Sequence, residues 1–153
     1  STLYAAFWVY GILKSSDGGL HWTRLTNGLP SSQFDRIALA ISATNPAILY
    51  AGYHYVVPNR YNGALLLRTT DGGNSWSQVR APNYCGSQCW YDNVVAIDPA
   101  DARKIYLGGS ANYVSQPTFA VKAVVIKSVD GGSQWLDMSP NDSAAHTLHP
   151  DMH

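Results

Sequence analysis

The chain has 153 residues, of which 46% are hydrophobic and 13% are charged, and ten basic side chains balance ten acidic ones. A formal net charge of zero argues against a nucleic-acid-binding protein, which normally carries a basic surface. The longest apolar runs, such as residues 123–126, have the length of a strand, so no membrane-spanning helix is predicted. Thirteen Gly, eight Pro and ten Tyr favour β structure with many turns.

Short strands separated by turns are predicted along the chain. In chain order they cover residues 3–6, 11–15, 37–42, 49–52, 65–69, 76–79, 94–98, 105–108 and 123–128. They group into units of four strands, each roughly 55 residues long, which is typical of the blades of a β-propeller. A β-sandwich is the second interpretation, but a sandwich would not repeat the same turn at this interval.

One turn motif occurs three times. Residues 15–22, 69–76 and 128–135 all follow the pattern Ser/Thr-x-Asp-Gly-Gly-x-x-Trp, each preceded by Lys or Arg, and their aspartates are 54 and 59 residues apart. We call these segments the box turns. The Asp can accept backbone N–H groups, the glycines supply positive φ, and the Trp packs on the sheet. One Asp per turn is no oxygen cage for calcium. We therefore interpret the following residues as structural: Asp17, Trp22, Asp71, Trp76, Asp130 and Trp135.

The box turns resemble the Asp-box, or bacterial neuraminidase repeat, of sialidases, sortilin-type receptors, xyloglucanase-like hydrolases and photosystem-assembly propellers. Residues 25–30 and 36–41 are similar to the secreted bacterial branch described as glycosyl-hydrolase-like or sortilin-like. The resemblance implies an all-β fold, in which about three four-stranded antiparallel blades are part of a larger propeller of roughly six to ten blades. It also implies an extracellular or periplasmic location, and it is more specific for the fold than for an activity.

We expect a single partial propeller over residues 1–153, with blade boundaries near 1–34, 35–90 and 91–148. Residues 149–153 would then begin the next blade. An open stack of three blades leaves two blade faces exposed. The expected partners are the remainder of the propeller, or another chain, on these faces, and a protein or glycan ligand. Neither nucleic acid nor a membrane span is expected.

Cys85 and Cys89 are four residues apart. A disulfide that closes a small loop is the first interpretation, and it would indicate an oxidising compartment. Two buried free thiols are the alternative. Metal binding is a weaker interpretation, because no second cysteine pair supplies further ligands.

Polar residues near the starts of the predicted innermost strands would lie at the mouth of a central channel. Asp92 and Asp151 occupy equivalent positions there and form the candidate catalytic pair. The alternative is that such residues only solvate the channel rim. Two long inserts carry aromatic residues suited to sugar faces or protein contacts, or to covering a blade edge. The candidate ligand-binding residues are Arg36, Tyr91 and His149 at the channel mouth, and Tyr55 and Tyr113 in the inserts.

His149, Asp151 and His153 would share one face of a strand and are candidate ligands of a divalent metal. Pro150 would bend that strand, and three adjacent ligands on a strand face rarely converge on one ion. A hydrogen-bonded role in the channel is therefore favoured, and no other cofactor is indicated.

Two functions are compatible with this pattern. The first is a protein- or glycan-binding scaffold. The second is a glycoside hydrolase of sialidase or xyloglucanase type with its site at the central channel, which needs two carboxylates roughly 5 Å or 6.5–9.5 Å apart. The chain contains no Glu, and of its six arginines only Arg36 lies at the predicted channel mouth. The Glu and the arginine cluster of a sialidase site are therefore not visible. Whether the chain is an enzyme is left open by the sequence.

Overall fold

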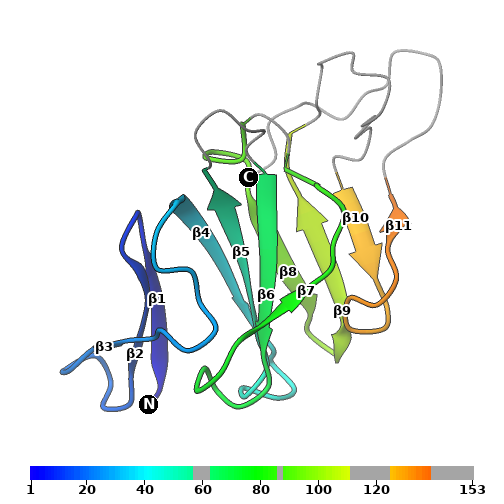
Figure 1. Cartoon of the computed structure of the whole chain (residues 1–153). Helices are drawn as coiled ribbons and strands as arrows, with labels where there is room; N and C mark the ends of the chain where they lie inside the picture. Colours follow the sequence, from blue (N-terminus) through cyan, green and yellow to red (C-terminus); the bar gives the residue numbers. More distant parts are fainter. Residues whose placement is uncertain (57–62, 86–87, 111–124, 139–153) are drawn as a thin grey trace.

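The computed structural model describes residues 1–56, 63–85, 88–110 and 125–138. In this part of the chain, eleven strands form three antiparallel sheets, and no α-helix is present. Figure 1 shows the sheets side by side, with the first sheet in blue and the third ending in orange. The predicted all-β class is confirmed.

Each sheet is a meander whose neighbouring strands follow one another in the chain. The first sheet contains β1 (Leu3–Phe7), β2 (Gly11–Ser15) and β3 (Thr23–Arg24). The second contains β4 (Phe34–Ile41), β5 (Leu49–Tyr55), β6 (Gly63–Thr69) and β7 (Ser77–Val79). The third contains β8 (Val94–Asp98), β9 (Asp101–Gly108), β10 (Val125–Ser128) and β11 (Leu136–Asp137).

The box turns are the hairpins that join the last two strands of each sheet, namely β2–β3, β6–β7 and β10–β11. At the opposite side of the second sheet, its first strand β4 contacts both β1 and β8. Adjacent sheets are therefore in contact near their first strands, as blades around a common axis would be (Figure 1).

Two apolar clusters hold the three sheets together. Leu49 and Tyr53 of β5 pack with Ile12 of β2, between the first and second sheets. Tyr50 of the same strand packs with Ile105 of β9, between the second and third sheets. Successive side chains of a strand point to opposite faces, so β5 is buried on both sides. Burying each large side chain contributes roughly 1.5–3 kcal/mol, so the packing between sheets stabilises the fold.

The described residues include no apolar helix of the length needed to cross a membrane.

Candidate functional site

The three box turns share one hydrogen-bond network. The hydroxyl of the first residue donates to the Asp carboxylate over 2.7–2.8 Å. The same hydroxyl accepts the N–H of the second glycine over 2.8–3.0 Å. Both glycines of every turn have φ between 68° and 99°, which a residue with a Cβ adopts only with strain. The sequence pattern therefore encodes a specific turn rather than a loose loop.

Each box carboxylate is occupied by its own turn. It accepts the backbone N–H of the residue four positions later at 3.0 Å, that of His21, Ser75 or Gln134. The bonds from the backbone and ring of His21 hold the pKa of Asp17 at about 2. Hydrogen bonds lower the pKa of Asp71, and the bond from the Ser75 hydroxyl has the largest effect. The hydrogen bond from the Gln134 backbone N–H is the main cause of the lowered pKa of Asp130. A carboxylate held ionised in this way stabilises the turn, and it is unsuited to act as a general acid at neutral pH.

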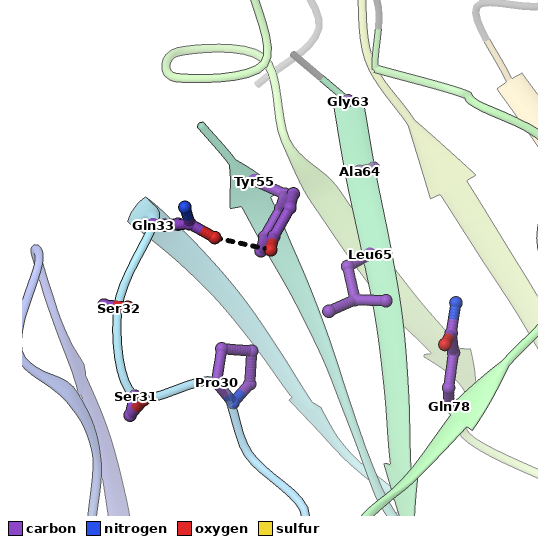
Figure 2. A pocket seen from close by; sticks show the side chains of 9 residues that line it. All are labelled: Pro30, Ser31, Ser32, Gln33, Tyr55, Gly63, Ala64, Leu65 and Gln78. Atoms are coloured by element: carbon purple, nitrogen blue, oxygen red, sulfur yellow. Dashed lines mark hydrogen bonds between the residues drawn. The ribbon is translucent and has the colours of Figure 1, made fainter. Parts of the chain in front are cut away.

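A pocket of about 650 Å³ opens at the end of the second sheet where β5 ends and β6 begins. Its wall combines the loop that precedes β4 with side chains of β5, β6 and β7 (Figure 2). The lining residues are Pro30, Ser31, Ser32, Gln33, Tyr55, Gly63, Ala64, Leu65 and Gln78. Hydroxyl, amide and apolar groups are present in this lining, and none of the nine side chains is charged.

Tyr55 is fixed at one side of this pocket. Its hydroxyl donates to Oε1 of Gln33 over 2.8 Å, which is the dashed line in Figure 2. The backbone N–H of Val56 also bonds the carbonyl of Gln33 over 2.7 Å. These two bonds tie the end of β5 to the loop before β4, so the aromatic ring is positioned before any ligand arrives.

The described candidates for the channel mouth lie on or beside the first strands of two sheets. Arg36 is half-buried in β4, while Tyr91 and Asp92 precede β8, which contacts β4. Tyr91 is exposed and its ring lies 5.6 Å from that of Trp90. Asp92 is 0% exposed, so its carboxylate lies inside the protein rather than at a solvent-filled rim.

The other sequence-predicted site residues, His149, Asp151, His153 and Tyr113, lie outside the described residues. The Asp92–Asp151 pair and the metal group therefore stay predictions. Among the residues that are described, no three His, Cys, Asp or Glu side chains come together as metal ligands.

One ionisable pair was not singled out from the sequence. Nδ1 of His54 lies 2.6 Å from Oδ1 of Asp35, and the imidazole is only 3% exposed. Its other nitrogen, Nε2, is buried without a hydrogen-bond partner in the part of the chain that is described. Asp35 lies in an irregular stretch of β4, between Phe34 and Ile37, where the pairing with β5 shifts. An irregularity of this kind leaves no signal in the residue pattern.

The predicted disulfide between Cys85 and Cys89 is confirmed. Both cysteines are buried, and the Ser110 hydroxyl donates to the carbonyl of Cys85 over 2.8 Å. The bridge thus closes a loop within the segment before β8, and the hydrogen bond from Ser110 joins this segment to the residues that follow β9.

Comparisons with known proteins show the fold and leave the family open. No protein-family profile matches the sequence. Neural-cadherin of Drosophila melanogaster is 32% identical over 119 residues, which are 78% of this chain and 3% of that protein. The chain thus spans only 3% of the length of this relative, and the similarity does not establish that it belongs to the same family.

Several solved structures have a similar fold. The GH74 xyloglucanase of Xanthomonas campestris has a TM-score of 0.62 at 23% identity, covering 88% of this chain and 18% of that one. The GH74 enzyme of Niastella koreensis has a TM-score of 0.62 at 20% identity, covering 88% and 19%. YCF48 bound to D1 peptide has a TM-score of 0.59 at 18% identity, covering 87% and 35%. This chain therefore has a β-propeller-type fold, as the sequence predicted.

Proposed function

We propose that this chain is an Asp-box propeller segment that acts as a binding scaffold in an extracellular or periplasmic compartment. Its ligand is a glycan held in the pocket beside Tyr55. The observation that carries this function is the uncharged pocket of about 650 Å³, which has a fixed tyrosine at its edge. The box-turn geometry supports the Asp-box assignment, and the disulfide supports an oxidising compartment.

The lining fits the chemistry of a neutral sugar. Amides of Gln33 and Gln78 offer both donors and acceptors, and Ser31 and Ser32 add hydroxyls. The ring of Tyr55 offers an apolar face on which the C–H groups of a pyranose can stack. An anionic or cationic ligand would find no opposite charge among the nine lining side chains. A neutral glycan is therefore favoured over a charged peptide.

Calorimetric titration with xyloglucan oligosaccharides, and in parallel with an uncharged peptide, tests this proposal. We expect oligosaccharide binding that Tyr55→Ala weakens roughly tenfold or more, because an aromatic anchor in a pocket carries much of the binding energy. Tyr55→Phe, which keeps the ring, should weaken it less. Tyr10→Ala is the matched control, since Tyr10 is an exposed tyrosine outside the pocket lining. Binding of the peptide alone, or oligosaccharide binding indifferent to Tyr55→Ala, would contradict the proposal.

Glycoside hydrolysis is the second candidate, and the similarity to two GH74 structures favours it. Hydrolysis requires two carboxylates flanking the scissile bond. Asp92 is the described carboxylate predicted for this role, and its complete burial favours binding over hydrolysis. Reducing sugar released from xyloglucan, and lost in Asp92→Asn with the fold intact, would reverse this preference.

A further inference from the structure

Gln33 has a strained backbone at the edge of the pocket. Its φ is 63°, a left-handed value that residues other than glycine rarely adopt. The chain is held on both sides of this position. The carbonyl of Gln33 accepts the N–H of Val56 over 2.7 Å, and the next residue, Phe34, is 5% exposed with its ring 5.1 Å from that of Tyr53. Glycine would adopt this conformation without strain. A glutamine here therefore lowers the stability of the fold, and strain of this kind is typical of functional sites.

Tyr55 determines how the amide of Gln33 is oriented. Tyr55 is opposite Phe34 in the pairing of β4 with β5, so it lies beside the residue that precedes Phe34. Its hydroxyl donates to Oε1 of Gln33, and Figure 2 shows the amide nitrogen on the side away from this bond. Reversing the amide would break the bond, because a nitrogen that carries two hydrogens cannot accept. The two N–H groups of Nε2 bond no other described residue, so they are available to a ligand.

The pocket thus has a donor and an acceptor that are both fixed before a ligand arrives. The hydroxyl hydrogen of Tyr55 is used by Gln33, so the phenolic oxygen can only accept a hydrogen bond from a ligand. Nε2 of Gln33 can only donate. A sugar hydroxyl can do either, so two neighbouring hydroxyls of one ring satisfy both atoms. Gln78, the other amide of the lining, is exposed and its side chain bonds no other described residue.

We propose that Gln33 is the specificity-determining residue of this pocket, where its amide donates to one hydroxyl of a neutral sugar and the oxygen of Tyr55 accepts from a neighbouring hydroxyl. This inference rests on the proposed glycan-binding function and adds the pair of atoms that recognises the ligand. Since both side chains are held in place in the free protein, binding immobilises them at little further loss of conformational entropy.

Calorimetric titration with xyloglucan oligosaccharides tests the role of the amide. Gln33→Met keeps an unbranched side chain and removes the donors, so it should weaken binding roughly tenfold. Gln78→Met should weaken binding less, because that amide is not held in one orientation before the ligand binds. Gln134→Met is the control outside the pocket, since Gln134 is an exposed glutamine of the third box turn. It should bind like the unmodified chain.

A Tyr55→Phe background separates contact with the ligand from support of the tyrosine. Tyr55→Phe removes the bond between the two side chains and keeps the ring. If the amide of Gln33 touches the ligand, Gln33→Met should weaken binding roughly threefold or more in this background as well. A glutamine that only orients the tyrosine hydroxyl would have no further effect there.

Gln33→Gly separates binding from folding. Glycine relieves the strained φ, so this variant should unfold at the same or a higher urea concentration than the unmodified chain. Its affinity for the oligosaccharide should nevertheless fall as in Gln33→Met. Unfolding at a clearly lower urea concentration would show that the side chain serves the fold, and it would overturn the inference.

The outcomes distinguish this inference from the function on which it rests. An unmodified chain that does not bind the oligosaccharide contradicts the glycan-binding function, and the role of Gln33 falls with it. Equal binding by the unmodified chain and Gln33→Met overturns the role of Gln33 alone. The same holds if Gln33→Met has no effect in the Tyr55→Phe background. In both of these cases the glycan-binding function stands.

Discussion

The hydroxyl of Tyr50 donates a hydrogen bond to the carbonyl of Gly131, 81 residues later in the chain. Gly131 belongs to a box turn, so this turn closes its own hairpin and also binds the neighbouring sheet. Burial raises the pKa of Tyr50 above its usual range, which keeps the hydroxyl protonated and able to donate. The same relation between Tyr4 and Gly72 joins the first two sheets.

The ammonium of Lys14 should contribute to the stability of the contact between the first two sheets. Lys14→Met keeps an unbranched side chain and removes the bond to the carbonyl of Gly72. Hydrogen bonds to charged groups contribute roughly 1.5–3 kcal/mol, and partial exposure favours the lower end. Urea unfolding at neutral pH should show this loss. Lys104→Met, at a half-buried lysine that does not precede a box turn, is the control, and an equal loss there would contradict this role of Lys14.

Acid should weaken the box turns. The folded pKa of Asp17 is about 2, below the value of about 3.9 expected in the unfolded chain, and the pKa of Asp71 is lowered in the same direction. Their stabilisation is therefore complete above about pH 4 and is lost as the pH falls through the folded value near 2. The urea concentration at the midpoint of unfolding should therefore fall steeply as the pH is lowered from about 4 to about 2.

The double substitution Asp17→Asn and Asp71→Asn isolates this effect. The variant should be less stable at neutral pH, and its stability should decline less in acid, because the two titrating groups are gone. Asp98→Asn, outside the box turns, is the control. A variant whose acid profile matches that of the unmodified chain would show that the box carboxylates are not responsible.

Gly28 is a position where a side chain should not be tolerated. Its φ is +78°, and a Cβ placed on it would overlap the backbone carbonyl of Trp76 in the second box turn. Gly28→Ala should lower the free energy of unfolding by about 1–3 kcal/mol through backbone strain alone. Gly63→Ala, at a glycine without positive φ and with only side-chain neighbours at 3.4–3.5 Å, should cost much less. Equal stability of the two variants would contradict the close approach at Gly28.

Reduction of the disulfide should destabilise the third sheet. The bridge closes a short loop, for which the entropy of the unfolded chain predicts about 2 kcal/mol. The double variant Cys85→Ser and Cys89→Ser should unfold at a correspondingly lower urea concentration. Adding a reducing agent should affect the unmodified chain and leave the variant unchanged. Identical unfolding of the unmodified chain with and without reductant would argue against the bridge.

The sheets could be predicted because the box turn requires defined residue types at fixed offsets, so each copy marks the hairpin between the last two strands of a sheet. The tyrosine–cation pairs can also be recognised in the sequence. A tyrosine strand and a cation before the box recur in all three units, although only the three-dimensional register shows that they meet.

The pocket and the burial of Asp92 could not be predicted in the same way. The pocket forms where the loop around Gln33 meets β5 and β6, and this meeting depends on how separate segments pack. The residue count predicts Asp92 near the mouth of a central channel and gives no information on its burial, which the structure shows to be complete. The count locates a residue along a strand and does not determine which atoms of neighbouring sheets cover it.

Box turns join neighbouring sheets through the hydroxyls of Tyr4 and Tyr50. Urea unfolding of Tyr4→Phe, Tyr50→Phe and Tyr106→Phe tests this role of the tyrosines most directly. Removing a hydrogen-bonding hydroxyl should cost about 0.5–1.5 kcal/mol at Tyr4 and Tyr50, whose carbonyl partners lie in the same chain. It should cost nothing measurable at Tyr106. Equal losses at all three positions, or no loss at Tyr4 and Tyr50, would contradict the claim.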